Sequence, residues 1–483
     1  MPWCMPSPSD APARRGGTAI ATATVAVIAV VAVLLAAAWL WRSVPQGPGG
    51  GIVSGRTASA STPALPPEFA QAPALLAFTA QAQGGLEPCG CVAGMHGGLA
   101  RRASLLARVP AASTLVLDGP GWNAGAADYQ VVKSRFYLDA SRIAGVDALA
   151  LGAADLRLGA AVLTRVLAQP QRPPVVCANL DPAAAAAVGA VASLRVSWMG
   201  RDTVVTALAA AGGEGLPVGD VAVALLRVID AAGTAPVVAV TELDAEAAEA
   251  LARQVPGAAV LIAAGSRDPV EVPRQVGSTR IVGASNHGKV LGWYRPEAVA
   301  GTPAALYELI RDTIPDDAEV RATIRSYQEA LGAMDLAIDE RLGGGLTRLG
   351  GGEQASFAGT DSCLACHADA HRIHAASRHA HALATLEKKG YARDPECLKC
   401  HVTGLGQAGG WPRRGGGPEW AAAVSCESCH GRGSGHVAAK QGRADTAGGA
   451  PLTAVTPATC TACHDGDNSP HFDYVGYWPK IAH

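Results

Sequence analysis

The sequence predicts a multidomain chain with an N-terminal transmembrane helix, a middle α/β domain, and a mostly α-helical and irregular C-terminal domain. Three observations lead to this prediction. Residues 18–41 form an apolar run without a charged side chain, which is long enough to cross a membrane. Between residues 73 and 300, short apolar runs alternate with helical patterns, as in layered α/β domains. In the last quarter of the 483 residues, the motif Cys-x-x-Cys-His occurs four times.

The first 72 residues predict a membrane anchor and a tether. At helical rise, residues 18–41 span a hydrocarbon core of about 30 Å. Arg14 and Arg15 precede the run, so the positive-inside rule places residues 1–17 in the cytoplasm. The expected topology is a single-pass protein of the inner membrane with its body in the periplasm. A cleavable signal peptide ending at Ala36-Ala37-Ala38 is the alternative. Residues 42–72, rich in Pro, Gly, Ser and Thr, predict a flexible linker.

The composition argues against a nucleic-acid partner and against a scaffold held by disulfides. The formal net charge is −2, so no nucleic-acid partner is expected. Eight of the twelve cysteines belong to the repeated motif. The four that remain are too few for a disulfide scaffold in a chain of this length.

The middle domain, residues 73–300, is predicted from its apolar runs. They are Leu75–Phe78, Thr114–Asp118, Ala148–Gly152, Val221–Ile229, Val237–Val240, Val260–Ala264 and Arg280–Ala284. Residues 244–255 predict a helix, with Asp244 as its N-cap and acidic residues in the first turn.

Five stretches of this domain resemble the catalytic domain of 5′-nucleotidase-type metallophosphatases. They are Phe78-Thr-Ala-Gln-Ala-Gln-Gly84, Gly97-Gly-Leu-Ala-Arg-Arg102, Leu115-Val-Leu-Asp118, Leu149-Ala-Leu-Gly152 and Gly288-Lys-Val-Leu-Gly292. The resemblance implies a four-layer sandwich of two sheets with helices outside. It also implies two metal ions bound on loops at the strand ends.

The metal ligands of that family are missing from this chain. The ligand positions hold Gln81 and Gln83, Gly121, Ala153-Ala154, Thr241-Glu242 and Ala264-Gly-Ser-Arg267. A dinuclear site needs several carboxylate and imidazole donors that converge on the metal ions. We therefore predict a metallophosphatase-like scaffold that lacks metal ligands and phosphatase activity.

The middle domain keeps one other candidate site, Cys89 and Cys91 with His96. The two thiols could bind a soft metal, react with thiols, or simply lie in a loop. Asp118 and Asp155 are expected to be structural, and Cys177 to act as a small apolar side chain.

A helical connector and linker are predicted for residues 301–360. Ala304–Gly332 has apolar positions at helical spacing, consistent with one or two amphipathic helices broken near Pro315. Gly343–Gly359 predicts a second flexible joint, which separates the C-terminal domain, residues 361–483.

Each Cys-x-x-Cys-His motif is the attachment signature of a c-type haem. The two cysteines form thioethers with one porphyrin, and the histidine that follows ligates the iron. A zinc ribbon would not need a histidine after every second cysteine. The predicted attachment residues are Cys363 and Cys366, Cys397 and Cys400, Cys426 and Cys429, and Cys460 and Cys463, with His367, His401, His430 and His464 as proximal ligands. This predicts four covalently bound haem c groups.

The sixth ligands are expected to be histidines. No methionine occurs between Asp361 and His483, whereas seven histidines remain after the four proximal ones. Bis-histidine ligation gives lower reduction potentials than His/Met ligation.

The C-terminal domain also resembles the tetrahaem cytochromes that take electrons from hydroxylamine oxidoreductase. The matching stretches are Ser377-Arg-His-Ala380, Cys397-Leu-Lys-Cys-His-Val-Thr-Gly404, Cys426-Glu-Ser-Cys-His-Gly-Arg-Gly-Ser-Gly-His436 and Tyr477-Trp-Pro-Lys-Ile-Ala-His483. The resemblance implies distal ligands His436 for the first haem, His379 for the third and His483 for the fourth. It leaves the second haem, held by His401, open or weakly ligated. His371, His374, His381 and His471 remain unassigned.

The expected function is electron transfer in a respiratory or nitrogen-compound redox chain, with redox partner proteins or quinol-linked donors. The alternative is a multihaem redox enzyme that acts on a small nitrogen or oxygen species at the open second haem. A phosphoesterase is less consistent with the missing ligands. The middle domain could also be a docking module for a redox partner.

Overall fold

The computed structural model describes residues 62–89, 95–266, 268–283, 287–299, 301–334, 356–412, 416–443, 452–466, 468–469 and 471–483. All of them belong to one compact unit, Gly50–His483. The predicted cytoplasmic N-terminus, residues 1–17, and residues 42–61 of the predicted linker, residues 42–72, lie outside the described residues.

The predicted transmembrane anchor requires a correction. No helix in the described ranges has the length and apolar character needed to cross a membrane. The longest described helices, α4 (Asp128–Ile143) and α10 (Ala318–Ala333), have 16 residues each, include charged side chains, and reach about 24 Å. Residues 18–41 themselves lie outside the described part of the chain. The predicted single-pass location in the inner membrane, with a periplasmic body, is therefore withdrawn.

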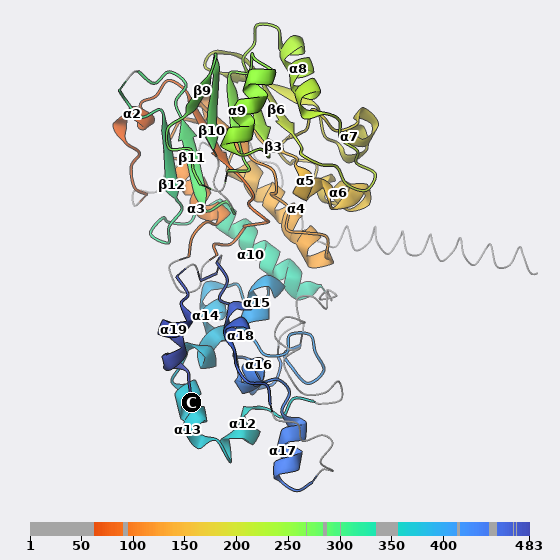
Figure 1. Cartoon of the computed structure of the whole chain (residues 1–483), viewed down its shortest axis with the longest axis vertical. Helices are drawn as coiled ribbons and strands as arrows, with labels where there is room; N and C mark the ends of the chain where they lie inside the picture. Colours follow the sequence, from red (N-terminus) through yellow and green to blue (C-terminus); the bar gives the residue numbers. More distant parts are fainter. Residues whose placement is uncertain are drawn as a thin grey trace, which may run out of the picture. The chain divides into compact units, whose positions relative to one another are not determined.

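Two six-stranded sheets form the middle of the chain (Figure 1). The first has the order β12-β11-β1-β2-β3-β4. Its strands β1 (Leu75–Thr79), β2 (Thr114–Asp118), β3 (Ala148–Ala150) and β4 (Val175–Val176) are parallel. Strand β11 (Val290–Tyr294) is antiparallel to β1, and β12 (Ala305–Leu309) is antiparallel to β11. The second has the order β5-β6-β7-β8-β10-β9. Its parallel strands are β6 (Arg201–Leu208), β7 (Val237–Thr241), β8 (Val260–Ala263) and β10 (Thr279–Gly283), and its antiparallel edge strands are β5 (Ser193–Trp198) and β9 (Arg274–Val276).

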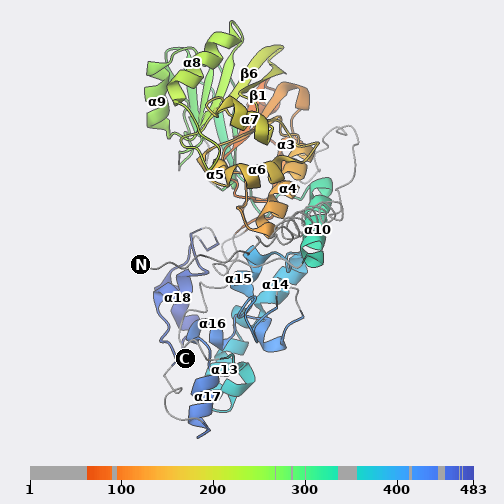
Figure 2. The same cartoon turned by 90° about the vertical axis from the view of Figure 1, so that its right-hand side faces the viewer.

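The alternation of side chains along the strands builds four layers. In β1, Leu76 and Phe78 belong to the core between the two sheets, whereas Leu75 and Ala77 face the helices outside. α3 (Leu99–Leu106), α4, α6 (Gly159–Leu167) and α10 cover the first sheet, and α8 (Val221–Ala232) and α9 (Ala245–Gln254) cover the second (Figure 2). Three short helices complete this part: α2 (Pro67–Ala70), α5 (Ala153–Leu156) and α7 (Pro182–Val188). This confirms the predicted four-layer sandwich. We call residues 62–334 the sandwich.

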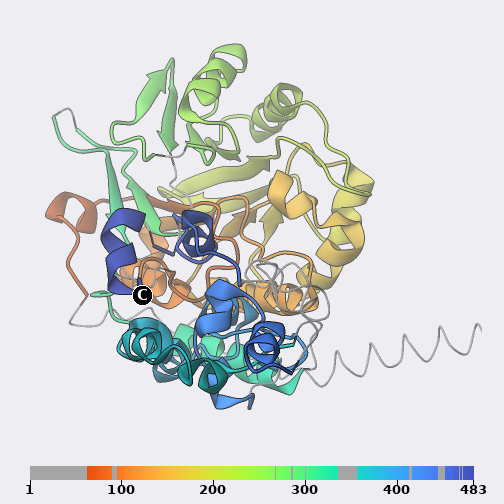
Figure 3. The same ribbon diagram turned by 60° about the horizontal axis from the view of Figure 1, so that its bottom comes forward.

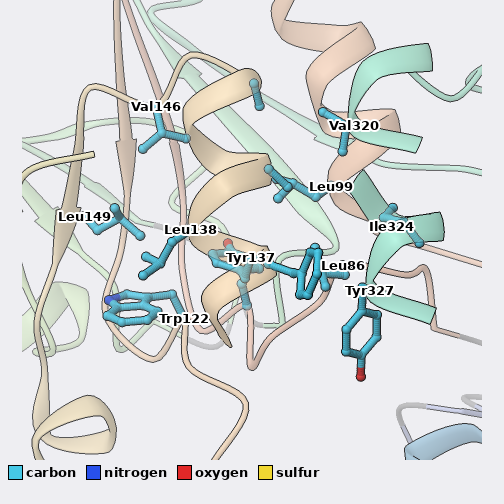
Figure 4. Close-up of a cluster of buried hydrophobic side chains, with 14 of the residues drawn as sticks. Leu86, Leu99, Trp122, Tyr137, Leu138, Val146, Leu149, Val320, Ile324 and Tyr327 are labelled. Carbon is cyan, nitrogen blue, oxygen red and sulfur yellow. The ribbon is translucent and has the colours of Figure 1, made fainter. Parts of the chain in front are cut away.

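The helical layer over the first sheet has its own apolar core. Figure 4 shows side chains of α3, α4 and α10 in contact there, among them Leu99, Tyr137, Leu138, Val320, Ile324 and Tyr327. α10 therefore packs as part of the sandwich rather than as a free connector.

Two local predictions were wrong. The apolar run Val221–Ile229, predicted among the strands, is helix α8, which begins after Asp220, whose side chain accepts a hydrogen bond from the Val223 amide at 2.8 Å. Within Ala304–Gly332, predicted as one or two amphipathic helices, residues 305–309 form strand β12, and helix α10 begins only at Ala318. The predicted helix at 244–255 is confirmed as α9, and Asp244 caps it through the Ala247 amide at 2.8 Å.

In the C-terminal region, residues 356–483, the described residues form short helices joined by irregular segments, as predicted (Figure 3). Its helices are α12 (Thr360–Leu364), α13 (Ala368–Ala375), α14 (Ala382–Lys389), α15 (Pro395–His401), α16 (Cys426–His430), α17 (Ser434–Lys440), α18 (Pro457–Thr461) and α19 (Tyr474–Tyr477).

Candidate haem-binding centre

The first cysteine of each Cys-x-x-Cys-His motif lies in a helix. Two copies lie entirely within one helix, in α15 and α16. In the first and fourth copies the histidine amide donates to the carbonyl of the first cysteine, at 2.9 Å in both. One helical turn places residues three and four apart on one face, so the two thiols and the imidazole of a motif can meet the same ligand.

Three of the four proximal histidines have an anchored Nδ1 atom. In His401, Nδ1 lies 2.7 Å from the carbonyl oxygen of Ala382. In His430, Nδ1 lies 3.3 Å from the carbonyl oxygen of Thr453, and in His464 it lies 2.9 Å from the Ser469 hydroxyl. Because a carbonyl oxygen only accepts, Nδ1–H donates in His401 and His430. This tautomer carries its lone pair on Nε2, the arrangement of a metal-ligating histidine whose orientation is held by a hydrogen bond.

Two predicted distal histidines each lie beside a proximal one. The ring centroids of His379 and His464 are 6.1 Å apart, and those of His430 and His483 are 5.7 Å apart. An imidazole nitrogen lies about 2 Å from a metal ion that it ligates, so two rings on opposite sides of one ion have centroids roughly 6 Å apart. Both pairs therefore fit bis-histidine ligation of one iron each.

These pairs differ from those that the resemblance implies. His379 lies beside the fourth motif rather than the third, and His483 lies beside the third rather than the fourth. His436 is half-buried on α17, and His367 of the first motif is exposed at the start of α13. Of the unassigned histidines, His374 places Nε2 2.8 Å from the carbonyl oxygen of Val424.

The surroundings of His379 and His464 favour neutral imidazole. Burial, aided by the neighbouring ring of His464, lowers the pKa of His379 to about 4. The ring is therefore uncharged at neutral pH, and neutral imidazole is the form that ligates metals. Phe472 stacks on His464 with centroids 4.7 Å apart and an angle of 13° between the planes.

The motifs themselves lie close together in two pairs. The neighbouring Cys426 thiol is the main cause of the raised pKa of Cys363, so the first and third motifs are neighbours. In the same way, the neighbouring Cys400 thiol is the main cause of the raised pKa of Cys463, so the second and fourth motifs are neighbours. Cofactors attached at these cysteines would lie near each other, as electron transfer between them requires.

At the strand ends of the sandwich, the positions of the family's metal ligands make polar contacts within the chain. Gln81 and Gln83, both with positive φ, follow β1. Gln83 Nε2 lies 3.3 Å from His287 Nε2, and Gln81 Nε2 donates to the Ala264 carbonyl at 3.4 Å. Glu242 accepts from the Ala153 amide at 2.8 Å. Among the described residues, no group of three or more His, Cys, Asp or Glu side chains is arranged to hold a metal ion.

The two buried aspartates of the sandwich have structural contacts. Asp118 forms a buried ion pair with Arg102, with Nη2 and Oδ2 2.9 Å apart. Asp155 is fully buried, and it accepts from the Gly121 amide at 2.7 Å and from Asn123 Nδ2 at 2.7 Å. The Asp155 contacts tie together the segments that follow β2 and β3, and the Asp118 ion pair ties the end of β2 to α3.

The cysteine loop of the sandwich is described only in part. Cys89 and His96 exchange two backbone hydrogen bonds, of 2.9 and 2.7 Å, whereas Cys91 lies outside the described residues. Cys177 is buried after β4, and its Sγ lies 3.4 Å from Asn179 Oδ1.

Several sandwich residues that no sequence motif marks contact the helix of the second motif. Lys133 of α4 binds Asp394, the N-cap of α15, with Nζ and Oδ2 2.7 Å apart. Tyr129 donates to Glu396 in the same helix at 2.7 Å. The only signal in the sequence is Asp394 followed by Pro395, a typical helix start, directly before Cys397.

Comparison with known proteins gives two separate likenesses. The model of the family described as cytochrome c554 and c-prime matches residues 362–431. Cytochrome c-554 of Nitrosomonas europaea is 33% identical over 94 residues, which cover 16% of this chain and 40% of that protein. The chain thus spans less than half the length of this relative.

Solved structures similar to this chain match about half of its length. They include a 5′-nucleotidase precursor from Thermus thermophilus (TM-score 0.45, 20% identity, 54% of this chain and 59% of that one). A sulfate thiohydrolase from Thermus thermophilus has a TM-score of 0.46 at 17% identity, covering 55% and 61%. The NAD nucleotidase of Haemophilus influenzae has a TM-score of 0.40 at 12% identity, covering 54% and 56%.

The two likenesses are of unequal weight. The structural matches stay below a TM-score of 0.5, and the sandwich rests on its own strand order and layers. The sequence match covers the first three haem motifs and the segments between them. Residues 362–431 of this chain therefore resemble the cytochrome c554 and c-prime family, whose haem c groups are bound covalently.

Proposed function

We propose that this chain is a tetrahaem c-type cytochrome that transfers electrons between redox partner proteins in a respiratory or nitrogen-compound redox chain. The observation that carries the proposal is the approach of His379 to His464 and of His483 to His430, each at the spacing of two ligands of one iron. Quinol-linked donors are one class of partner that could supply the electrons.

The four motifs would hold the haems through Cys363 and Cys366, Cys397 and Cys400, Cys426 and Cys429, and Cys460 and Cys463. When bound, haem c supplies a one-electron redox centre whose potential depends on its axial ligands. Carbonyl groups of Ala382 and Thr453 and the Ser469 hydroxyl hold proximal imidazoles in a fixed orientation. Fixed ligands reduce the rearrangement that accompanies a change of charge.

The axial pairs are part of the proposal. His464 and His379 would ligate one iron, and His430 and His483 another. His436 remains the proposed distal ligand of the first haem through the family resemblance. The two pairs of neighbouring motifs, first with third and second with fourth, support a chain of closely spaced centres.

A ligand exchange tests the proposal directly. We expect His379→Met to raise the reduction potential of one haem, because methionine ligation favours the reduced state. The exposed His381, in the same short segment, gives the matched control His381→Met, which should leave all potentials unchanged. The measurement is a redox titration followed by optical and paramagnetic resonance spectra, after haem staining and mass determination of the denatured protein.

Two results would contradict the proposal. If the denatured protein had the mass of the bare polypeptide, no haem would be covalently attached. If all four haem potentials stayed unchanged in His379→Met, His379 would not be an axial ligand. A high-spin signal that changes on addition of nitric oxide would instead favour a redox enzyme over a carrier.

A further inference from the structure

A buried ionic cluster joins the sandwich to the helix of the second haem motif. Lys133 of α4 lies 2.7 Å from Asp394 Oδ2 and 3.4 Å from Glu87 Oε2, measured from Nζ. The Lys133 side chain is 10% exposed, that of Glu87 5%, and that of Asp394 0%. Two carboxylates thus share one ammonium group away from water.

Asp394 connects Lys133 to α15, the helix that carries the second haem motif. Its Oδ1 atom accepts from the Glu396 amide at 2.9 Å, and its carbonyl accepts from the Cys397 amide at 3.0 Å. These bonds cap the first turn of α15, which carries Cys397, Cys400 and His401. Tyr327 of α10 also donates to Asp394 Oδ2, at 3.1 Å.

A second contact fixes the next residues of the same helix. Glu396 Oε1 accepts from the buried Tyr129 hydroxyl at 2.7 Å and from Gln130 Nε2 at 3.2 Å. Both donors lie on α4, one turn before Lys133. One sandwich helix therefore holds α15 at its N-cap and in its first turn.

Stability alone does not explain such a cluster. Taking three charged groups out of water costs several kcal/mol per ion, and apolar replacements of buried ion pairs are often as stable or more so. Gln328 Nε2 donates to Glu87 Oε1 at 2.9 Å, but Glu87 Oε2 has no hydrogen-bond partner within the described structure apart from the approach of Lys133. The cluster keeps three charged side chains at a buried position where apolar side chains would often give equal or greater stability.

We propose that Lys133 is a positioning residue for the second haem, through which the sandwich sets both the orientation of α15 and the electrostatic field at that haem. The inference rests on the proposed haem attachment at Cys397 and Cys400. The ammonium of Lys133 opposes the two buried carboxylates and so favours the reduced, more negative haem. The sandwich thereby tunes one redox centre of the C-terminal region.

Two substitutions with opposite expected signs test this. Lys133→Met leaves both carboxylates without a cation and should lower the reduction potential of one haem. We expect the equilibrium constant for its reduction to fall at least tenfold, which is about 59 mV for one electron. Asp394→Asn keeps a good N-cap residue, removes a negative charge, and should raise the same potential. Lys133→Arg should restore the wild-type value. Arg165→Met removes the exposed pair with Asp128 on the sandwich and should change nothing.

The titration component is assigned by a Cys397→Ala/Cys400→Ala variant, which should lack it. A purely structural role predicts that Lys133→Met and Asp394→Asn move the potential in the same direction or not at all, and that result overturns the inference. If Lys133→Met does not fold, Asp394→Asn and Lys133→Arg still decide the sign. Loss of haem from the wild-type protein would instead contradict the proposed function, so the two failures are distinguishable.

Discussion

The core between the two sheets and the described residues after Ala423 bury different kinds of side chain. Between the two sheets, Phe78, Leu117, Val240 and Ile262 are at most 2% exposed, and they belong to one continuous apolar cluster. In the C-terminal region, the last apolar side chain buried in the described structure is Ala423. Beyond it, the buried side chains are the polar or charged ones of Ser425, Glu427, Ser428, Thr459 and Ser469.

This difference indicates what holds each part together. The sandwich has an apolar core supplied by its own sequence, so burial of apolar surface can stabilise it. The described residues between 424 and 483 bury no apolar side chain, and their α-helices have seven residues or fewer. A covalently attached porphyrin would supply the missing apolar surface. The comparison therefore predicts that the two parts respond differently to loss of cofactor and to core mutations.

The largest expected effect is that of removing one haem attachment. We expect Cys460→Ala/Cys463→Ala to lose one haem and to unfold residues 452–483, because little else packs this segment. Limited proteolysis followed by mass spectrometry should show cleavage there, while the sandwich stays resistant. Cys177→Ala, at a buried thiol of the sandwich, is the matched control and should keep both the haem count and the protease resistance. Protection of residues 452–483 in the double variant would mean that the chain forms its own core.

A core truncation should show the opposite pattern. Phe78→Ala, at a side chain 1% exposed between the sheets, is expected to lower the free energy of unfolding of the sandwich by about 3–5 kcal/mol. Leu364→Ala, at a side chain 41% exposed in α12, should change stability by less than about 0.5 kcal/mol. Urea unfolding followed by tryptophan fluorescence and haem absorbance measures both. Equal effects at the two positions would erase the contrast between the regions.

The same contrast decides what the sequence could predict. Strands such as β1, β2 and β7 were predicted because they are short apolar runs buried on both faces. The run at residues 221–229 was misassigned for the same reason, since a wholly apolar segment has no period that separates a buried strand from a helix. The cap at Asp220 was the signal that favoured the helix.

The candidate site divides in a similar way. Proximal ligands follow from local spacing, because each motif contains its own histidine next to its cysteines. Distal pairing depends on the approach of distant segments, as His379 and His464 illustrate, so the resemblance implied other pairs. Lys133 was not predictable, because its partner Asp394 is 261 residues away and nothing local marks a lysine as buried.

The smallest expected effect lies at the junction of the two regions, in the pH dependence of stability. Burial raises the pKa of Glu87 above its ordinary value of 4.5; Asp394 adds to this rise, and Lys133 opposes it. The folded state then binds the proton more tightly than the unfolded state. Stability contributed by protonated Glu87 is fully present below pH 4.5 and is lost as pH rises through the folded pKa, by at most about 1.4 kcal/mol per pH unit for one proton.

Glu87→Gln should remove this loss, because the amide keeps the Oε1 acceptor for Gln328 but carries no titrating proton. Urea midpoints measured upward from pH 4.5 should fall for the wild type and stay flatter for the variant. Glu249→Gln on the surface of the sandwich serves as a comparison of opposite sign, because hydrogen bonds from Arg274 and Arg253 lower the pKa of Glu249. Its contribution is present above pH 4.5 and lost as pH falls below it. Equal slopes for the wild type and Glu87→Gln would mean that the junction does not hold a proton, and that its carboxylates act on the second haem only as fixed charges.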